Sequence, residues 1–534
     1  MKYIEQRYSK GQIAIIVALS LVVLIGMVGL GIDSGRGYGV KAKLNAATDA
    51  ASLAGARALS QGDTWDQQKA SATAAAKKFF HANYPDGYLG STPNNGVANH
   101  DPVVTVTANP VPPNCTPPYC GVTVQVAASA DVPVTFMRVL TLQDIHVSAS
   151  AVAGRPSVDL AFVMDITGSM SGVATSVKNR AKTFLDHLDV TRDRVTLITY
   201  NYGAMVNDPI QTTTRGFNKT LMQTHIGSLN FSGNTNFAEG FWQARNQLNL
   251  VPTTPVGNRS SLRIILFFTD GSPNTFSSTF PVRRMSTPNP ICNGGSPTCN
   301  CNNSSTNAGK CTSPTTRDCS CTCTGSLVTG DGSSGTPSGL YQHEKTDGSS
   351  VSGTCNRGNN IISTSTTTAG IYQLPLPPVL TAWYNAPHGG ILPPQELQIS
   401  PSPTAPPQLR TISTTPSFIS INRASRNLAE EMAWQAREEG IYIFVLGLGD
   451  LLHSSAGPDN EMGERLLMCM ANTNKEENGN ATTPLSRCYD KNQTDGKNIP
   501  LGNQPVGTYC WARDDASLKV CYDKMASQIL RLLN

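Results

Sequence analysis

Asp165, Thr167 and Ser169 are three hard-oxygen side chains on alternate residues of one short loop. They follow residues 160–164, a continuous apolar run typical of a central parallel strand, so the loop lies at the carboxyl end of that strand. One carboxylate and two hydroxyls can supply part of the octahedral oxygen shell that Mg²⁺ requires. Because three ligands do not fill this shell, other segments must contribute.

Two later segments can complete the set of ligands. Residues 263–270 repeat the pattern of a buried strand that ends in a carboxylate, so Asp270 is placed like Asp165. Thr235 lies in the loop before the helical pattern of residues 237–250, where its hydroxyl is free to reach a shared site. The sequence therefore predicts a cation site at one edge of a sheet.

The order Asp165-x-Thr167-x-Ser169, then Thr235, then Asp270 resembles the metal-ion-dependent adhesion site of the von Willebrand factor A domain. Thr167 stands where many members carry Ser, and it keeps the hydroxyl. The resemblance implies one Mg²⁺ ion, or Mn²⁺ or Ca²⁺, whose open coordination position is occupied by a carboxylate of a partner protein. Two other interpretations stay open: these are ordinary strand-end turn residues, or they form a relic site that holds no ion.

The amino terminus contains a segment that can cross a membrane. Lys2, Arg7 and Lys10 precede residues 11–32, which are uncharged, mostly apolar and long enough to span a bilayer as a helix. Positive charge before the span predicts a cytoplasmic amino terminus. A cleaved signal peptide is the alternative, but the run is longer than a usual signal core and no A-x-A-like site directly follows it. We expect an uncleaved single-pass anchor.

A second resemblance begins in the same region. Gly11-Gln12, Asp33 and the Ala-rich residues 41–56 (KAKLNAATDAASLAGA) resemble the amino-terminal module of TadG-like proteins of the Flp, or tight-adherence, pilus system. Proteins of that family commonly join this anchor to a von Willebrand factor A domain. The resemblance implies an anchor in the inner (cytoplasmic) membrane, with the bulk of the chain periplasmic or extracellular. No Glu stands at the fifth place after Gly11, which argues against cleavage and polymerisation as a pilin.

Length and pattern indicate several modules in an α/β chain of 534 residues. We expect an anchor with an Ala-rich helix in residues 1–60, and a helix with a small β-rich module in residues 61–154. Residues 155–534 then form a doubly wound von Willebrand factor A-like domain, interrupted by a Cys/Ser/Thr/Pro-rich insertion at residues 274–416. The net charge of +4 is too small to predict nucleic-acid binding.

Alternating and apolar runs predict the individual elements. The expected strands are residues 103–107, 122–127, 146–153, 195–200, 262–269, 440–449 and 509–512, and the expected helices are residues 173–188, 217–226, 237–250, 422–439, 463–471 and 518–533. Within the insertion, residues 375–407 are typical of an extended linker.

The cysteines predict disulfides, since the chain beyond the anchor lies in an oxidising space. The insertion holds Cys292, Cys299, Cys301, Cys311, Cys319, Cys321, Cys323 and Cys355, and a metal cluster is the competing interpretation. Two further sets are Cys115 with Cys120 at a hairpin tip, and Cys469, Cys488, Cys510 and Cys521 near the closing helix. Cys469 could instead be a core residue, and we expect His343 at the surface.

No arrangement of residues predicts an enzyme. Hydrolysis at the cation site needs a general base, and Asp159 and Asp208 are candidates only by default. We therefore expect a membrane-anchored, metal-dependent protein that binds pilus or envelope components during Flp/Tad pilus assembly or anchoring. The alternatives are a surface adhesin that binds an external ligand with the metal site and the insertion, and a structural minor pilin.

Overall fold

The structure is a computed structural model. In it the chain forms two compact units. The first unit comprises residues 1–156 and 533–534, and the second comprises residues 157–532. The described residues are 10–59, 65–94, 100–108, 122–155, 157–254, 259–260, 262–284, 299–301, 319–351, 391, 393–402, 405–413, 417–474, 488–490, 493–497 and 500–531.

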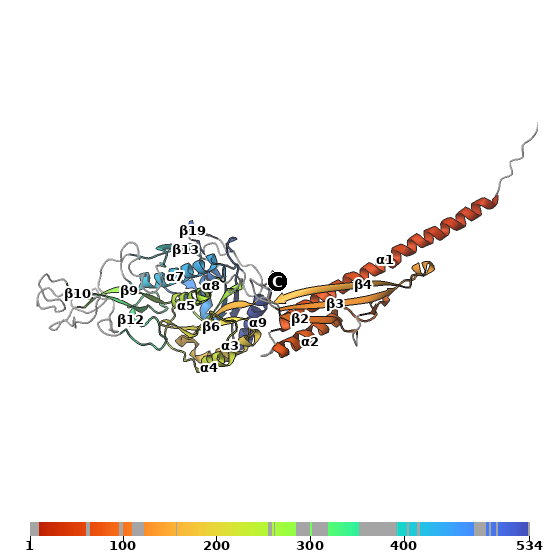
Figure 1. Ribbon diagram of the computed structural model, residues 1–534. Coiled ribbons are helices and arrows are strands. Elements are labelled where there is room, and N and C mark those ends of the chain that lie inside the picture. The colour runs from red at the N-terminus through yellow and green to blue at the C-terminus, as the bar shows by residue number, and fades with distance from the viewer. Residues whose placement is uncertain are drawn as a thin grey trace, which may run out of the picture. The chain divides into compact units, whose positions relative to one another are not determined.

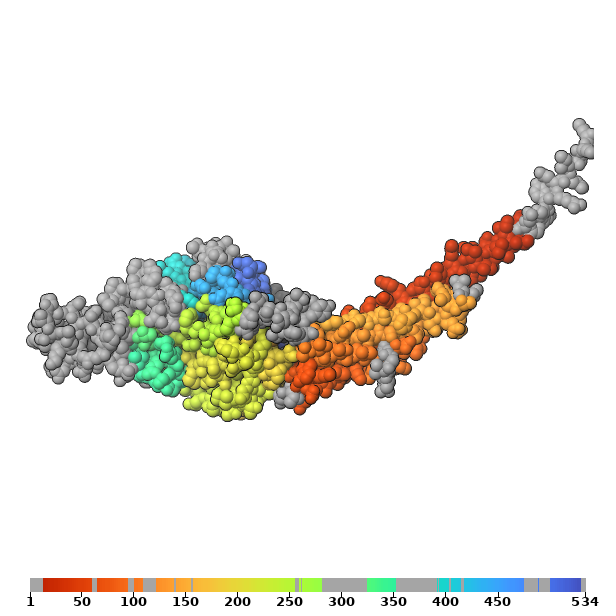
Figure 2. Space-filling view, in the orientation of Figure 1, coloured from red at the N-terminus to blue at the C-terminus, as the bar shows by residue number. Residues whose placement is uncertain are grey.

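One long helix, α1 (Lys10–Ala58), carries both the apolar segment and the Ala-rich segment of the first unit. Its large side chains from Ile13 to Ile32 are exposed, and the helix is long and apolar enough to cross a membrane by length and composition. Further along, Val40 and Leu44 are fully buried. Figure 2 shows the exposed part of the helix in red, extending beyond the rest of this unit. One helix thus combines a membrane-compatible half with a core-forming half.

The core-forming half of α1 packs on an antiparallel sheet and on a second helix (Figure 1). These elements are α2 (Trp65–Asn83), β1 (Thr92–Pro93), β2 (Val103–Ala108), β3 (Val122–Pro133) and β4 (Asp144–Arg155), with short 3-10 turns η1 (Tyr88–Gly90) and η3 (Met137–Leu140). The three predicted strands of this module are confirmed. The hairpin of β3 and β4 is longer than predicted, because the small residues from Ala127 to Ala130 give little apolar alternation.

A six-stranded sheet in the order β20-β15-β8-β5-β6-β7 forms the centre of the second unit. Its strands are β5 (Val158–Asp165), β6 (Arg194–Tyr200), β7 (Ala204–Asp208), β8 (Leu262–Thr269), β15 (Ile441–Leu448) and β20 (Thr508–Ala512). All neighbours are parallel except the edge strand β7, which pairs antiparallel with β6. β7 was not among the predicted strands.

Helices cover both faces of this sheet, which confirms the doubly wound α/β fold. They are α3 (Ala174–Phe184), α4 (Lys219–Ser228), α5 (Phe237–Leu250), α7 (Phe418–Glu438), α8 (Gly463–Ala471) and α9 (Asp515–Arg531). On one face, α5, α7 and α8 contribute residues such as Phe241 and Leu428 to the core cluster that includes Phe267 of β8. On the other face, Phe184 of α3 and Tyr522 of α9 surround Phe162. The predicted helices match these elements within a few residues at each end.

The insertion contains strands that its polar composition does not predict. They are β9 (Thr275–Arg284), β10 (Cys299–Cys301), β11 (Cys319–Val328) and β12 (Ser338–Tyr341) in one antiparallel sheet, and β13 (Glu396–Ile399) paired with β14 (Gln408–Thr411). Phe276, Phe280, Leu327 and Leu340 join the main core, so a few apolar residues anchor a mostly polar segment. The predicted linker at residues 375–407 is accordingly wrong where β13 lies.

Two disulfides fasten the carboxyl-terminal part. Cys469 of α8 pairs with Cys488 at the start of β18 (Cys488–Asp490), and Cys510 of β20 pairs with Cys521 of α9. The second bridge ties the closing helix to strand β20, whereas the first joins α8 to β18 and does not reach the closing helix. Two disulfides are thus confirmed in this set, but only one fastens the closing helix, and Cys469 is not a free core residue. The predicted pairing of Cys115 with Cys120, and the bridges of the insertion, concern residues or side chains outside the described part of the chain.

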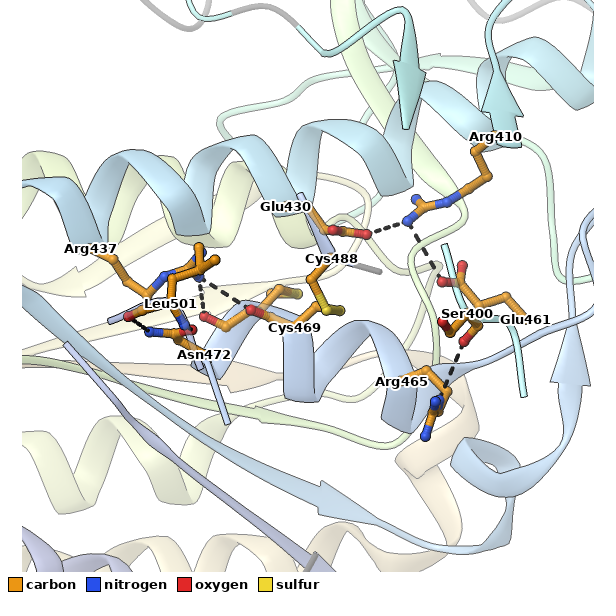
Figure 3. The surroundings of a disulfide bond; sticks show 11 residues. Ser400, Arg410, Glu430, Arg437, Glu461, Arg465, Cys469, Asn472, Cys488 and Leu501 are labelled. Atoms are coloured by element: carbon orange, nitrogen blue, oxygen red, sulfur yellow. Dashed lines mark hydrogen bonds and ion pairs between the residues drawn. A yellow bond between two sulfur atoms is a disulfide. The ribbon is translucent and has the colours of Figure 1, made fainter. Parts of the chain in front are cut away.

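A buried ion-pair group lies near the first disulfide (Figure 3). Arg410 of β14 is fully buried and pairs with Glu430 of α7 and, at 3.6 Å, with Glu461. Arg426 of α7 donates to the same Glu461 at 2.9 Å. A buried charge is costly without a partner, so Arg410 and its two glutamates are held together. Arg410 lies near the end of the insertion and Glu430 lies in α7, so these pairs fasten the end of the insertion to the domain.

Arg410→Ala is expected to lower the free energy of unfolding of the second unit by about 3–5 kcal/mol, because Glu430 loses its buried cationic partner. The measurement is chemical denaturation of the full chain in detergent, followed by tryptophan fluorescence. The control is Arg180→Ala, which breaks the partly exposed Arg180–Asp515 pair and changes stability far less. Equal effects of the two substitutions would contradict a structural role for the buried group.

Candidate metal centre

Asp165 and Asp270 come together because their strands are neighbours in the parallel sheet. Met164 of β5 lies opposite Phe268 of β8, so Asp165 ends one strand beside the turn that holds Asp270. Asp165 is fully buried and Asp270 is 6% exposed. The fold therefore places two carboxylates side by side at the carboxyl edge of the sheet, as the sequence predicts.

Hydrogen bonds fix the orientation of the Asp165 carboxylate. The backbone N–H of Thr167 donates to Oδ1 at 2.8 Å. The hydroxyls of Thr269 and Tyr200 donate to Oδ2 at 2.7 and 3.1 Å. Thr269 and Tyr200 have no place in the sequence prediction, although both stand at strand ends on this edge. The carboxylate is thus held rigidly while lying in a low-dielectric environment.

Thr167 and Ser169 link the two carboxylates. The Thr167 and Ser169 hydroxyl oxygens are 3.1 Å apart, and the Ser169 hydroxyl donates to Asp270 Oδ1 at 2.9 Å. Thr167 is buried, whereas Ser169 is exposed at the start of the turn η4 (Gly168–Val173). Four of the five predicted ligands therefore form one connected group that opens toward solvent at Ser169.

Thr235, the fifth predicted ligand, lies on a loop that is tied to the first loop by backbone hydrogen bonds. Gly168 N–H donates to Gly233 O at 3.1 Å, and Ser232 N–H donates to Ile166 O at 2.8 Å. Gly233 has a φ of 89°, which favours glycine at this turn. Within the described residues the Thr235 hydroxyl makes no hydrogen bond, so it is available to a ligand.

Asn274 is a positioning residue that the sequence pattern does not reveal. Its Oδ1 accepts from Thr235 N–H at 2.9 Å, and its backbone N–H donates to Thr235 O at 3.0 Å. Its Nδ2 donates to Asp331 of the insertion at 2.8 Å, and Thr329 N–H donates to its carbonyl at 2.9 Å. Asn274, the first residue of the insertion, thus ties the Thr235 loop to Thr329 and Asp331 further along it.

The insertion also packs beside the neighbouring loop. Ala204 N–H donates to His343 O at 2.9 Å, and Asn201 Nδ2 donates to Thr346 O and Ser232 O at 2.7 and 2.9 Å. His343, expected at the surface, is only partly exposed because this pairing draws it against the domain. The insertion is therefore part of the surroundings of the site.

The electrostatics of the site favour a cation. Burial and the neighbouring charge of Asp165 raise the pKa of Asp270 to about 8. Burial also raises the pKa of Asp165, against the effect of its hydrogen bonds. Among the described residues no Lys, Arg or His pairs with either carboxyl. Two buried carboxylates without a counter-ion repel each other, and a divalent cation relieves that repulsion.

The donor set fits a hard divalent cation. Two carboxylates and three hydroxyls are oxygen ligands of the kind that Mg²⁺, Mn²⁺ and Ca²⁺ prefer. Across the described part of the chain, no three His, Cys, Asp or Glu side chains cluster in a way that could hold a metal, so no thiolate or imidazole site competes. Asp165, Thr167, Ser169, Thr235 and Asp270 would hold the ion; metal binding itself stays a prediction.

The default general bases lie elsewhere. Asp159 is at the opposite end of β5, about 20 Å along the strand from Asp165. It pairs with Arg194 and Arg215. Asp208 pairs with His225 Nδ1 at 2.9 Å. Neither carboxylate can activate a water at the site.

A pocket of about 220 Å³ adjoins the site. Ser169 and Asp270 form one wall, and its other lining residues are Val173, Ser176, Leu448, Gly449, Leu451, Arg513, Asp514, Asp515 and Leu518. Val173 and Leu451 are 43% and 57% exposed. The pocket thus offers an apolar surface directly beside the two ligands.

Comparison with known families agrees with the fold of the second unit. Residues 160–272 match the von Willebrand factor type A domain, which spans β5, the site loops and β8. The second unit therefore contains a von Willebrand factor A domain, with an insertion after Asp270.

Residues 11–58 match the family of Flp pilus-assembly TadE/G-like proteins, over nearly the whole of α1. The chain thus joins a TadE/G-like amino-terminal segment to a von Willebrand factor A domain. A comparison with curated proteins finds no match.

Among solved structures, the chain is similar to several bacterial pilus proteins. The von Willebrand factor domain of the type V pili tip protein Mfa5 from Porphyromonas gingivalis is 14% identical, with a TM-score of 0.31, over 72% of this chain and 98% of that one. The pilus adhesin SpaC from Lactobacillus rhamnosus GG is 12% identical, with a TM-score of 0.32, over 81% and 35%. The PilB minor pilin from Streptococcus sanguinis is 12% identical, with a TM-score of 0.32, over 83% and 79%.

The raised pKa of Asp270 predicts that the stability of the metal-free fold and the affinity for a cation both depend on pH. The shift from 3.8 to about 8 stabilises the metal-free fold fully below about pH 4, and that stabilisation is lost progressively as the pH rises to about 8. A cation must displace the proton, so binding at pH 7 is expected to release about one proton per ion and to tighten up to pH 8. Calorimetry in two buffers of different ionisation enthalpy measures this release. A wild-type chain that binds Mg²⁺ without releasing protons would contradict it.

Asn274→Ala is expected to weaken Mg²⁺ binding by about 10- to 100-fold, because Thr235 loses the side chain that positions its loop. Calorimetric titration of the full chain measures the change. The matched control is Asn218→Ala, which removes the side-chain cap of α4 and leaves the site loops untouched. Unchanged affinity in Asn274→Ala would show that Thr235 is not a ligand or needs no positioning.

Proposed function

We propose that this protein is a membrane-anchored, metal-dependent protein-binding component of a Flp/Tad-type pilus system. It acts in assembly or anchoring of the pilus in the bacterial envelope. The A domain captures a carboxylate of a pilus or envelope partner with one divalent cation, preferably Mg²⁺. The amino-terminal part of α1 crosses the inner membrane once, with its amino end in the cytoplasm and the chain that follows the span on the other side.

The observation that carries the proposal is the connected group of Asp165, Thr167, Ser169 and Asp270, open to solvent at Ser169. Its members are oxygen donors, and its two carboxyls lie buried without a cationic partner among the described residues. An ion bound there retains an accessible side, where a ligand from another molecule can complete its coordination. A carboxylate is the ligand best suited to a hard cation at that position.

The adjoining pocket supports a protein partner over a small anion. A segment whose carboxylate reaches the ion can insert a neighbouring apolar side chain between Val173 and Leu451, which are exposed at the pocket. Burying such a side chain adds roughly 1.5–3 kcal/mol. A small free carboxylic acid has no such side chain and gains no binding free energy from the pocket. The site is therefore suited to an acidic residue flanked by an apolar one.

Binding rather than catalysis is the better explanation of the metal. Asp159 and Asp208, the two default bases, are occupied by Arg and His partners away from the site. Two further carboxylates line the adjoining pocket, but Asp515 pairs with Arg180 and Asp514 accepts from the N–H and hydroxyl of Ser517. These bonds lower the pKa of both groups, which makes them weak bases for a metal-bound water. The matched families, a pilus-assembly segment and an A domain, are of the assembly and adhesion type.

Asp165→Ala is expected to weaken Mg²⁺ and Mn²⁺ binding by about 100-fold or more, because it removes a charged ligand from the site. Calorimetric titration of wild type and variant measures the metal step. Retention of Flp/Tad pilus proteins from solubilised envelopes on the immobilised full chain, with Mg²⁺ or with EDTA, measures the partner step.

Asp186→Ala is the matched control, since Asp186 is an exposed carboxylate of the same unit that pairs with Lys219. It should bind metal and partner as wild type does. Equal metal binding by wild type and Asp165→Ala would remove the proposed site. If Asp165→Ala loses metal binding but still retains the same pilus proteins, the assignment of the metal site would stand. Its role in partner capture would then be refuted.

A further inference from the structure

The tip of the β3–β4 hairpin, residues 134–143, lies against the apolar part of α1 (Figure 1). The two strands pair continuously up to Pro133 and Asp144, and the turn η3 closes the tip. No function described so far uses this tip. Its position beside a membrane-compatible helix indicates what it contacts.

Asp33 fastens the tip to α1. Its carboxylate accepts three backbone N–H groups, from Thr135 at 3.0 Å, Phe136 at 2.9 Å and Met137 at 2.8 Å. Asp33 itself is 1% exposed. Three charge-assisted hydrogen bonds to one carboxylate hold the tip in one register on the helix. Arg36 adds a bond from its Nη1 to Pro133 O at 3.0 Å.

Phe136 lies one helical turn further into the apolar segment. A side chain at Gly29 would meet Phe136, whose Cβ lies 2.3 Å from where a Cβ of residue 29 would be. The tip therefore packs so closely on α1 at Gly29 that a larger residue there would meet Phe136. Since Asp33 is the first charged residue after the apolar run, Phe136 sits about 5–6 Å inside that run along the helix axis.

The tip presents apolar side chains outward at this level. Phe136 and Leu142 are 41% and 46% exposed, although they belong to a hairpin whose strands bury alternate residues. The helix beside them exposes Leu30 and Ile32 at 48% and 50%. Arg138, on η3, is also exposed and can reach anionic head groups. Apolar and aromatic residues flanked by a basic one are typical of elements that lie in a membrane interface.

We propose that the hairpin tip is a second membrane contact, which inserts Phe136 and Leu142 into the outer leaflet of the bilayer that α1 crosses. The proposal rests on the membrane anchoring proposed above. The occupant of this surface is lipid, because the tip is fixed to the flank of the spanning segment and α1 exposes apolar side chains at the same depth. Two contacts with one bilayer restrain the tilt of the first unit, which a single helix leaves free.

The test is lipid quenching of a tryptophan in the full chain, reconstituted in phosphatidylethanolamine and phosphatidylglycerol liposomes. Phe136→Trp and Leu142→Trp each add one fluorophore at the tip. Lipids brominated on the acyl chains should remove most of the added emission, relative to wild type. Val152→Trp is the matched control, since Val152 is 47% exposed on β4, about 26 Å along the strand from Asp144. The emission that Val152→Trp adds should not change when the lipids are brominated.

Flotation of the same liposomes separates the two proposals. A chain that floats with the liposomes but keeps the tip emission unquenched would overturn the lipid contact and leave the anchor in place. Unquenched but blue-shifted emission at Phe136→Trp would assign the tip to a protein partner, including a second copy, and would also overturn it. A chain that does not float would refute the anchor and the lipid contact together.

Discussion

Two carboxylates buried side by side at the ends of adjacent parallel strands are the constraint on which the A domain depends. Such a pair is unfavourable unless a proton or a cation neutralises it. The pKa of about 8 at Asp270 is the protein's response without metal. The hydrogen bonds to Asp165 hold that carboxylate in position despite its burial. A divalent ion would neutralise the same pair, which is the physical basis of the proposed metal site.

The rest of the second unit positions this pair. Parallel pairing of β5 with β8 sets the two carboxylates beside each other, and the backbone bonds between the loops of Gly168 and Gly233 bring in Thr235. Asn274 extends the same hydrogen-bond chain into the insertion through Asp331. The insertion is fastened again at its far end by the buried Arg410–Glu430 pair. A partner bound at the ion would therefore lie beside a surface that is anchored at two points.

Much of this arrangement follows from the sequence, because central strands such as β5 and β8 are continuous apolar runs with a polar residue at the end. Asp165, Thr167, Ser169 and Asp270 are predicted from that signal and lie together. The local sequence pattern does not predict a hydrogen bond between residues that are far apart in the sequence. Asn274 acts through Thr235 and Asp331, and Asp33 binds backbone groups about a hundred residues away. β9 and β11 are missed because buried serines and threonines alternate with few large apolar residues.

The most direct test of metal-dependent capture is to locate the ion itself. Crystals of the wild-type chain grown with Mn²⁺ and measured near the manganese absorption edge should show one anomalous peak enclosed by Asp165, Thr167, Ser169, Thr235 and Asp270. One coordination position should face solvent or carry a carboxylate of a neighbouring molecule. A folded A domain with no peak between these residues, in crystals that hold Mn²⁺ elsewhere, would contradict the assignment of this strand-end group as a metal site.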